Sequence, residues 1–263
     1  MRRGPGLVML LVLVLVLALA LADARAQTVQ ASVQGAVAVP GTRTFGAGAR
    51  LADAVLDARP TELAYPLGAA LMRRSQIEAQ VRLKAGLLYD LDLLADPASA
   101  DAPLSQDASR LRAWLAGRAA TGRVVVQLEP RRLELDLAAN GLLADGDHFV
   151  YPLRPSTIAV VGAVVQDCTL PHVPLQDVAV YLPACARSRA ADRDQVYVVQ
   201  PDGHVQTVGI AAWNRSPPQA LAPGATVYVP LAERAVGKVD PDFNREFAAF
   251  IATQPLPAPA GSP

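Results

Sequence analysis

The chain carries the same short pattern at the end of two separate segments, and this repeat restricts the possible folds more than any other feature. Residues 142–153 read LLADGDHFVYPL, and residues 220–231 read ALAPGATVYVPL. Each has a turn rich in Gly, Pro or Asp and then alternating apolar residues before Pro-Leu, which is typical of a turn followed by a strand. The openings also match, because Gly35 and Gly162 both stand in a Gly-Ala-Val strand. We predict one module present twice; chance similarity between short apolar strands is the alternative.

Between its matched ends, each copy has the same predicted order of a strand, a short helix, a hairpin and closing strands. The second copy has a strong turn signal at residues 201–203, which read Pro-Asp-Gly, and its short helix is expected to turn Leu175 and Val178 inward. The first copy is expected to form its hairpin over residues 123–141, with the turn near Pro130. A small mixed sheet wrapped around one helix fits this order. We therefore predict the α+β class, with two β-grasp-like domains.

The first copy is 49 residues longer than the second between the matched glycine and Pro-Leu. Residues from about 65 to 118 account for this difference, with one helix expected from Pro66 to about residue 94 and another over residues 107–115. This helical pair either covers the sheet or forms a surface for a partner.

The end of the chain has the spacing of an amphipathic helix. Phe243, Phe247, Phe250 and Ile251 recur at i, i+4, i+7 and i+8. Such a helix packs on its own domain or enters a groove on a partner protein, so these four side chains are candidate partner-binding residues. The predicted boundaries are a leader at 1–26, a first domain at 27–155, a second domain at 156–235 and this helix at 240–254.

The N-terminus has the three parts of a secretory signal peptide. A basic start, Met1-Arg2-Arg3, precedes an apolar run over residues 7–21 and an Ala-Arg-Ala cleavage site at residues 24–26. The run is shorter than the ~20 apolar residues of a membrane helix, although an uncleaved anchor is the alternative. We predict an exported protein with no membrane span after cleavage. In an oxidising compartment Cys168 and Cys185 are expected to form a disulfide, with two buried free thiols as the alternative.

Charge and motifs exclude several classes of function. The 24 basic and 24 acidic residues balance, so the chain lacks the basic character typical of nucleic-acid binding. The histidines show no ligand spacing with the cysteines, so no metal site is predicted. No nucleophile elbow or zinc-protease motif occurs in the sequence. We predict no catalytic residue and no cofactor.

Arginines near the predicted strands are the candidate ligand-binding residues. An arginine in a cleft holds a carboxylate or phosphate through two parallel hydrogen bonds, and acidic sugars carry such groups. The alternative for each is an ordinary solvated arginine. Trp213 is added because an indole can stack on a sugar face. The candidate residues are Arg123, Arg131, Arg132, Arg154 and Trp213.

Longer stretches of the sequence resemble a known family. The most specific are YPLGAALMRRSQIEAQ, RPSTIAVVGAV and YVVQPDGHVQTVGIAAWN, with VQGAVAVPG and PGATVYVPL as weaker matches. They resemble the GfcC-like capsule biosynthesis proteins. The resemblance implies two β-grasp (SLBB-type) domains, a helical insertion and a terminal amphipathic helix. It also implies a periplasmic protein whose domains are similar to those of outer-membrane polysaccharide exporters. The cysteine pair is not part of the family pattern.

The leading functional hypothesis is a non-enzymatic periplasmic accessory protein of capsule or exopolysaccharide export. Its expected partners are the surface polysaccharide, the outer-membrane exporter, or both. One alternative is a polysaccharide-modifying enzyme with a charged cleft between the domains. Another is an adaptor that binds only proteins of the export machinery.

Overall fold

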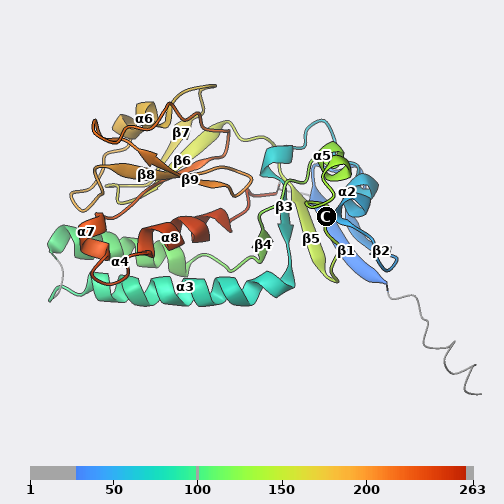
Figure 1. Cartoon of the computed structure of the whole chain (residues 1–263), viewed down its shortest axis with the longest axis horizontal. Coiled ribbons are helices and arrows are strands. Elements are labelled where there is room, and N and C mark those ends of the chain that lie inside the picture. Colours follow the sequence, from blue (N-terminus) through green and yellow to red (C-terminus); the bar gives the residue numbers. More distant parts are fainter. Residues whose placement is uncertain (1–27, 99–100, 259–263) are drawn as a thin grey trace, which may run out of the picture.

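The computed structural model describes residues 28–98 and 101–258 and contains two five-stranded sheets at opposite ends of the molecule (Figure 1). This confirms the predicted α+β class with two sheet units. The predicted leader at residues 1–26 lies outside the described residues. Within the described ranges, no helix is both long and apolar enough to cross a membrane.

The first unit contains the first sheet, with strand order β2-β1-β5-β3-β4. Only β1 and β5 pair in parallel; the other neighbours are antiparallel. Its strands are β1 (Val29–Gly35), β2 (Gly41–Phe45), β3 (Ala70–Met72), β4 (Arg123–Val124) and β5 (Asp147–Tyr151). Its helices are α2 (Leu51–Ala58), the 3-10 turn η1 (Pro66–Gly68) and α5 (Pro130–Leu135).

The second unit repeats this arrangement, with strand order β7-β6-β10-β8-β9 and one parallel pair, β6 with β10. Its strands are β6 (Thr157–Gly162), β7 (Cys168–Pro171), β8 (Gln195–Val199), β9 (Val205–Gly209) and β10 (Thr226–Val229). Its helices are α6 (Val178–Tyr181), η2 (Leu182–Ala184), α7 (Glu233–Val236) and α8 (Phe243–Ala252). Because both sheets follow one order, the predicted repeat is confirmed.

Gly35 and Gly162, from the two matched Gly-Ala-Val strands, occupy the same place in the two sheets. Gly35 lies beside Tyr151 with φ +98°, and Gly162 lies beside Val229 with φ +110°. A Cβ atom would lie 2.1 Å from the carbonyl oxygen of Tyr151 in the first sheet and 2.2 Å from that of Val229 in the second. Each site therefore requires glycine, both for its backbone angle and for the close approach of the neighbouring strand.

The helical insertion lies within the predicted range of residues 65–118, but its first helix starts later than predicted. The segment Ala70–Met72, expected to be helical, is strand β3, which pairs with both β5 and β4. The insertion, α3 (Arg74–Ala95) and α4 (Ala102–Ala116), therefore separates the two strands of a hairpin. At the same point of the second unit, the short turn at residues 201–203 joins β8 to β9.

The hairpin predicted over residues 123–141 is wrong. Only Arg123–Val124 forms a strand, and Pro130–Leu135 is helix α5. The alternation of Leu133, Leu135 and Leu137 with acidic residues resembled a strand. Two local signals favour the helix instead: Glu129 accepts hydrogen bonds from first-turn amides, and Pro130 occupies the first helical position, where its missing N–H removes no hydrogen bond.

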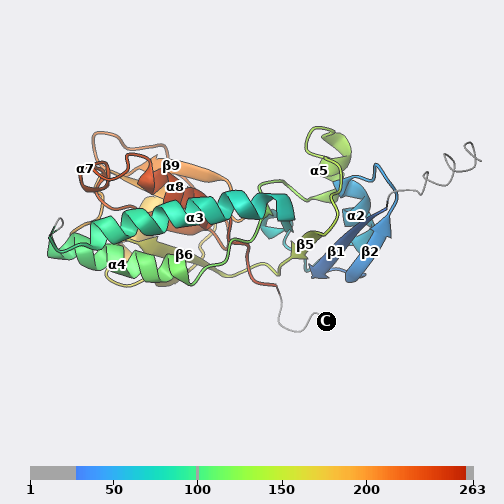
Figure 2. The ribbon, with the colours of Figure 1, turned by 90° about the horizontal axis from the view of Figure 1, so that it is seen from below.

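The insertion covers the second sheet rather than its own. Helices α3, α4 and α8 lie together below the second sheet (Figures 1 and 2). Leu87 and Leu91 of α3 and Leu111 and Leu115 of α4 are buried in the same core as the strands of the second unit. The first unit has a separate, smaller core. The helices inserted in the first unit thus complete the core of the second unit.

Helix α8 packs within the chain, which corrects its predicted use as a partner-binding helix. Phe243, Phe247 and Phe250 are fully buried, and Ile251 is 5% exposed. The ring of Phe247 stacks on Tyr228 of β10 with 4.9 Å between ring centroids. These side chains face the second sheet and the insertion helices, because that is where apolar surface is available to cover them.

A disulfide links Cys168 of β7 to Cys185, which follows η2, with 6.0 Å between their Cα atoms. It closes a loop in the second unit that contains α6. Constraining a loop of this length in the unfolded chain stabilises the fold by about 3 kcal/mol.

Candidate functional site

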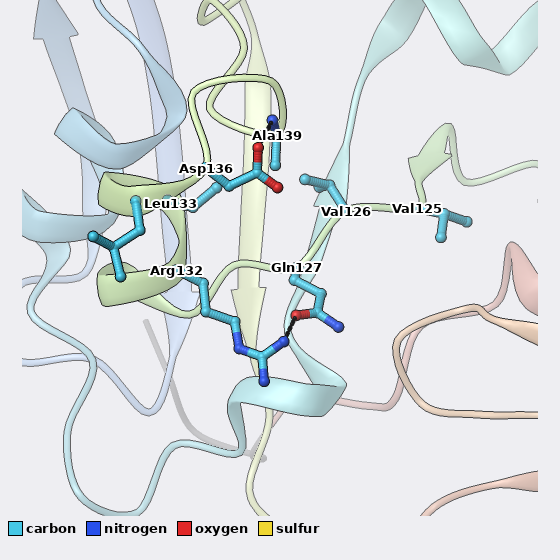
Figure 3. Close-up of a pocket in the computed structure, with 8 residues that line it drawn as sticks. Val125, Val126, Gln127, Arg132, Leu133, Asp136 and Ala139 are labelled. Atoms are coloured by element: carbon cyan, nitrogen blue, oxygen red, sulfur yellow. Dashed lines mark hydrogen bonds between the residues drawn. The ribbon is translucent and has the colours of Figure 1, made fainter.

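An open hollow on the described surface lies between α5 and residues 125–127, which follow β4 (Figure 3). A larger pocket of about 580 Å³ adjoins a smaller one of about 190 Å³. Both are lined by Val126, Gln127 and Arg132. We refer to the two pockets together as the groove.

Aliphatic side chains form the walls of the larger pocket. Leu133 of α5 is fully buried and anchors the helix in the first core, whereas Leu135 is 86% exposed at its rim. Val125, Val126 and Ala139 complete these walls. An apolar cavity that opens to solvent is typical of a ligand site.

Two carboxylates shape the backbone around the groove. Glu129 accepts hydrogen bonds from the amides of Arg131 at 3.3 Å and Arg132 at 2.9 Å, which starts helix α5. Asp136 accepts from the amides of Ala138 at 3.0 Å and Ala139 at 3.1 Å, which turns the chain after the helix. These local capping interactions fix the helix and the turn that form one side of the groove.

The charged groups that line the groove are mostly acidic. Arg132 donates from Nη1 to Oε1 of Gln127 at 2.6 Å, as Figure 3 shows. Glu129 and Asp136 line the groove from the first unit, and Asp202 lines it from the β8–β9 turn of the second. Three carboxylates thus accompany one guanidinium, which favours a neutral or basic ligand over an acidic one.

The main chain of residues 125–127 has free hydrogen-bonding groups. Among the described residues, nothing forms a hydrogen bond with the N–H or C=O groups of Val125, Val126 or Gln127. The ladder between β3 and β4 ends at Val124. Main-chain polar groups require partners, so those of residues 125–127 are left to water or to a ligand.

Of the predicted ligand-binding residues, Arg132 lines the groove and Arg123 does not. Arg123 is 6% exposed, and its guanidinium donates to the carbonyl oxygens of Ala252 at 3.1 Å, Gln254 at 3.3 Å and Pro201. Burial lowers the pKa of Arg123 to about 10. This side chain links β4 of the first unit to the second unit and the end of α8, where it lines a separate pocket of about 170 Å³, and its role in ligand binding stays a prediction.

The other three candidates are exposed and do not converge. Arg131 lies on α5 outside the groove lining. The guanidinium carbon of Arg154 lies 5.7 Å from the centroid of the Tyr65 ring. Trp213 is 77% exposed and donates from Nε1 to Asp194 at 3.3 Å. The structure therefore does not bring these candidates together at one site.

The acidic turn at residues 145–147 has a structural role. Asp147 is buried and accepts two hydrogen bonds from Arg73, at 2.8 and 2.7 Å, while Asp145 accepts from the amide of Gln30. In the described part of the chain, no group of three or more His, Cys, Asp or Glu side chains is placed to hold a metal ion.

Sequence reasoning missed most of the groove. Val126, Leu133 and Ala139 fall in the segment that was predicted to be a hairpin, and Asp202 comes from the other unit. One signal was present in the sequence. Glu129-Pro130 is typical of a helix start, and a helix over this segment cannot place Leu133, Leu135 and Leu137 on one face.

The architecture is that of an α+β protein made of two copies of one five-stranded unit, with an open groove on the first. Residues 166–255, most of the second unit and helix α8, match the family model described as capsule biosynthesis GfcC, C-terminal. The Escherichia coli (strain K12) protein YjbG, described as uncharacterized, is 27% identical over 215 residues, which cover 82% of this chain and 86% of the relative. Both comparisons support the predicted resemblance to the GfcC-like family. The description of the matched family model points to a role in capsule or polysaccharide assembly.

Proposed function

We propose that this protein is a non-enzymatic accessory protein of capsule or exopolysaccharide assembly that works in the periplasm. In this proposal it binds the surface polysaccharide or the outer-membrane exporter through the groove of the first unit. The observation that carries the proposal is the groove itself: an open cavity of about 580 Å³, one side of which is fixed by local capping interactions.

The roles of the charged side chains favour binding over catalysis. Glu129 and Asp136 accept hydrogen bonds from main-chain amides, and Arg132 donates to Gln127. A general acid or base must instead direct its reactive atom at a substrate. These groups act on the protein's own backbone and side chains, which supports a binding site rather than the alternative of a polysaccharide-modifying enzyme.

The test is direct binding by the chain from Gln27 onward. Calorimetry would measure its interaction with the organism's surface polysaccharide and, separately, with the periplasmic part of the exporter, and the recovered polymer would be analysed for cleavage or modification. We expect saturable binding to one of the two and an unaltered polymer. A shortened or modified polymer would overturn the non-enzymatic proposal, and an absence of binding to both would overturn the accessory role.

Two substitutions connect that binding to the groove. Ala139→Trp places an indole in the larger pocket, whereas Leu137→Trp adds the same group at a position that is 74% exposed and outside the lining. We expect Ala139→Trp to weaken binding at least about tenfold, the loss expected when a well-packed contact is blocked. Leu137→Trp should leave binding unchanged. Equal binding by both variants would place the site elsewhere.

A further inference from the structure

We propose that the groove binds an extended polypeptide segment, which pairs with the main chain of residues 125–127. In this complex an aliphatic side chain of the peptide enters the larger pocket and a lysine or arginine lies near the acidic residues. The proposal deepens the proposed function and rests on it, because it selects a protein segment rather than the polymer as the ligand of the groove.

The unpaired main chain of residues 125–127 favours an extended peptide as the ligand. Three consecutive residues, Val125, Val126 and Gln127, have N–H and C=O groups without a hydrogen-bond partner among the described residues. They directly follow β4, which stands at the edge of the first sheet. An extended peptide presents alternating acceptors and donors that can pair with the free N–H and C=O groups of such a segment, and added strands are a common mode of peptide recognition.

The chemistry of the walls also favours a peptide. The larger pocket is lined mainly by aliphatic groups, among them Val126, Leu133 and Leu135, and none of the aromatic side chains in the described part of the chain lines either pocket of the groove. A sugar ring in the larger pocket would find no aromatic face to stack on, and many of its hydroxyl groups would lie against aliphatic carbon, which is unfavourable. A valine or leucine side chain of a peptide fits such walls without that cost.

The charged side chains that line the groove favour a basic ligand. Glu129, Asp136 and Asp202 outnumber Arg132 among the charged lining residues. An acidic polysaccharide would be repelled, whereas a basic side chain would be attracted, and this attraction weakens as salt is added. Charge complementarity therefore selects a peptide that combines aliphatic and basic residues.

The position of the groove adds a role for the second unit. Asp202 lies in the β8–β9 turn, and a Cβ atom on the neighbouring Gly203 would lie 3.0 Å from Cγ2 of Val125. The turn of the second unit therefore packs against the start of the free segment. A bound peptide would contact both units, so its affinity depends on their association.

The probe is a fluorescent decapeptide of alternating lysine and valine, whose binding to the full mature chain is followed by fluorescence anisotropy. The first control has glutamate in place of lysine. The second has N-methyl groups on the valine amides, which block main-chain hydrogen bonds and keep the side chains. We expect saturable binding of the first peptide and at least about tenfold weaker binding of each control.

Variants of the protein connect the binding to the groove. Ala139→Trp should weaken peptide binding at least about tenfold, and Leu137→Trp should not. Asp202→Asn retains the acceptor for the amide of His204 and removes one charge, so it should weaken binding at low salt only. Equal affinity for the N-methylated peptide, equal binding by Ala139→Trp, or no saturation up to about 1 mM peptide would overturn the proposal.

The outcomes separate this inference from the proposed function. Polymer binding that Ala139→Trp abolishes, together with no peptide binding, would overturn the peptide and retain the accessory role. Peptide binding at the groove without binding to polymer or exporter would retain the peptide site and overturn the accessory role.

Discussion

Leu175 of the second unit occupies the backbone position that Gly48 occupies in the first. Both have positive φ angles, +61° for Leu175 and +84° for Gly48. Two residues after each of them, the chain forms an isolated β-bridge with the turn before the closing strand. The bridge joins Asp177 to Ala220 in the second unit and Arg50 to Leu142 in the first. The side chain of Leu175 is 90% exposed. The prediction that Leu175 faces inward is therefore wrong, because this turn directs the side chain away from the sheet.

Replacing Leu175 with glycine should stabilise the protein. A left-handed conformation costs an L-residue about 1–2 kcal/mol, and the exposed leucine gains little from packing. We expect Leu175→Gly to raise the free energy of unfolding by about 1 kcal/mol, measured from the midpoint of urea denaturation. The reciprocal Gly48→Leu should lower it, since a Cβ atom at Gly48 meets nothing within 4 Å and only the backbone cost applies. A less stable Leu175→Gly variant would show that Leu175 has a packing role.

The glycines at the parallel strand pairs should not tolerate alanine. Gly162→Ala combines a positive φ with a Cβ atom 2.2 Å from the carbonyl oxygen of Val229. We expect a loss of at least about 3 kcal/mol, measured by thermal and urea unfolding. Gly41→Ala is the matched control, with φ +113° and no atom within 4 Å of the added Cβ. Gly41→Ala should lose clearly less free energy of unfolding than Gly162→Ala. Equal losses would contradict the conclusion that the close neighbouring strand requires glycine at position 162.

Replacing Arg123 should loosen the end of the chain. Arg123→Met keeps much of the side-chain volume and removes the donors to the carbonyl oxygens of Ala252, Gln254 and Pro201. We expect a loss of about 3 kcal/mol and faster amide hydrogen exchange in residues 252–256. Arg131→Met is the control, because Arg131 is exposed. Unchanged exchange in Arg123→Met would contradict the proposed link between the units.

Stability should fall below about pH 6.5 because of His148. Burial lowers its pKa from the ordinary value of 6.5, and its Nδ1 lies 2.8 Å from Oγ of Ser32. The unfolded chain then binds a proton at a pH where the folded chain does not. The contribution of neutral His148 to stability is therefore complete above pH 6.5 and is lost as pH falls through the lowered pKa of the folded state.

A substitution isolates this contribution from those of the carboxylates. His148→Gln cannot become charged, so its free energy of unfolding should fall less steeply between pH 6.5 and 5 than that of the wild type. The measurement is urea denaturation at several pH values. Parallel curves for the two proteins would show that His148 does not titrate in this range.

The repeat could be predicted from the sequence, but the exact point at which the helical insertion interrupts the first copy could not. Gly35 and Gly162 are required by local geometry, so the same residue recurs wherever the same strand pairing recurs. Strand β3 has only three residues and directly precedes a long helix. Its pairing with β4 depends on contacts across the whole insertion, and no local periodicity reports such contacts.

The groove was less predictable than the fold for a similar reason. Arg132 could be selected by its charge and its position near a strand, but its neighbours are brought together by tertiary structure. Asp202 belongs to the other unit, and Leu135 alternates with acidic residues as a strand residue would. The phenylalanines of α8 illustrate the reverse error, since an amphipathic spacing indicates a buried face without indicating which surface covers it.

The packing of the insertion on the second sheet has a consequence for synthesis. Helices α3 and α4 leave the ribosome before any strand of the sheet that covers Leu87, Leu91 and Leu111. These leucines remain uncovered until nearly the whole chain has been made, because α8 completes the same core. Contacts so distant in sequence slow folding and prolong the exposure of apolar surface. The nascent chain is thus expected to depend on chaperones in a way that two consecutive, self-contained domains would not.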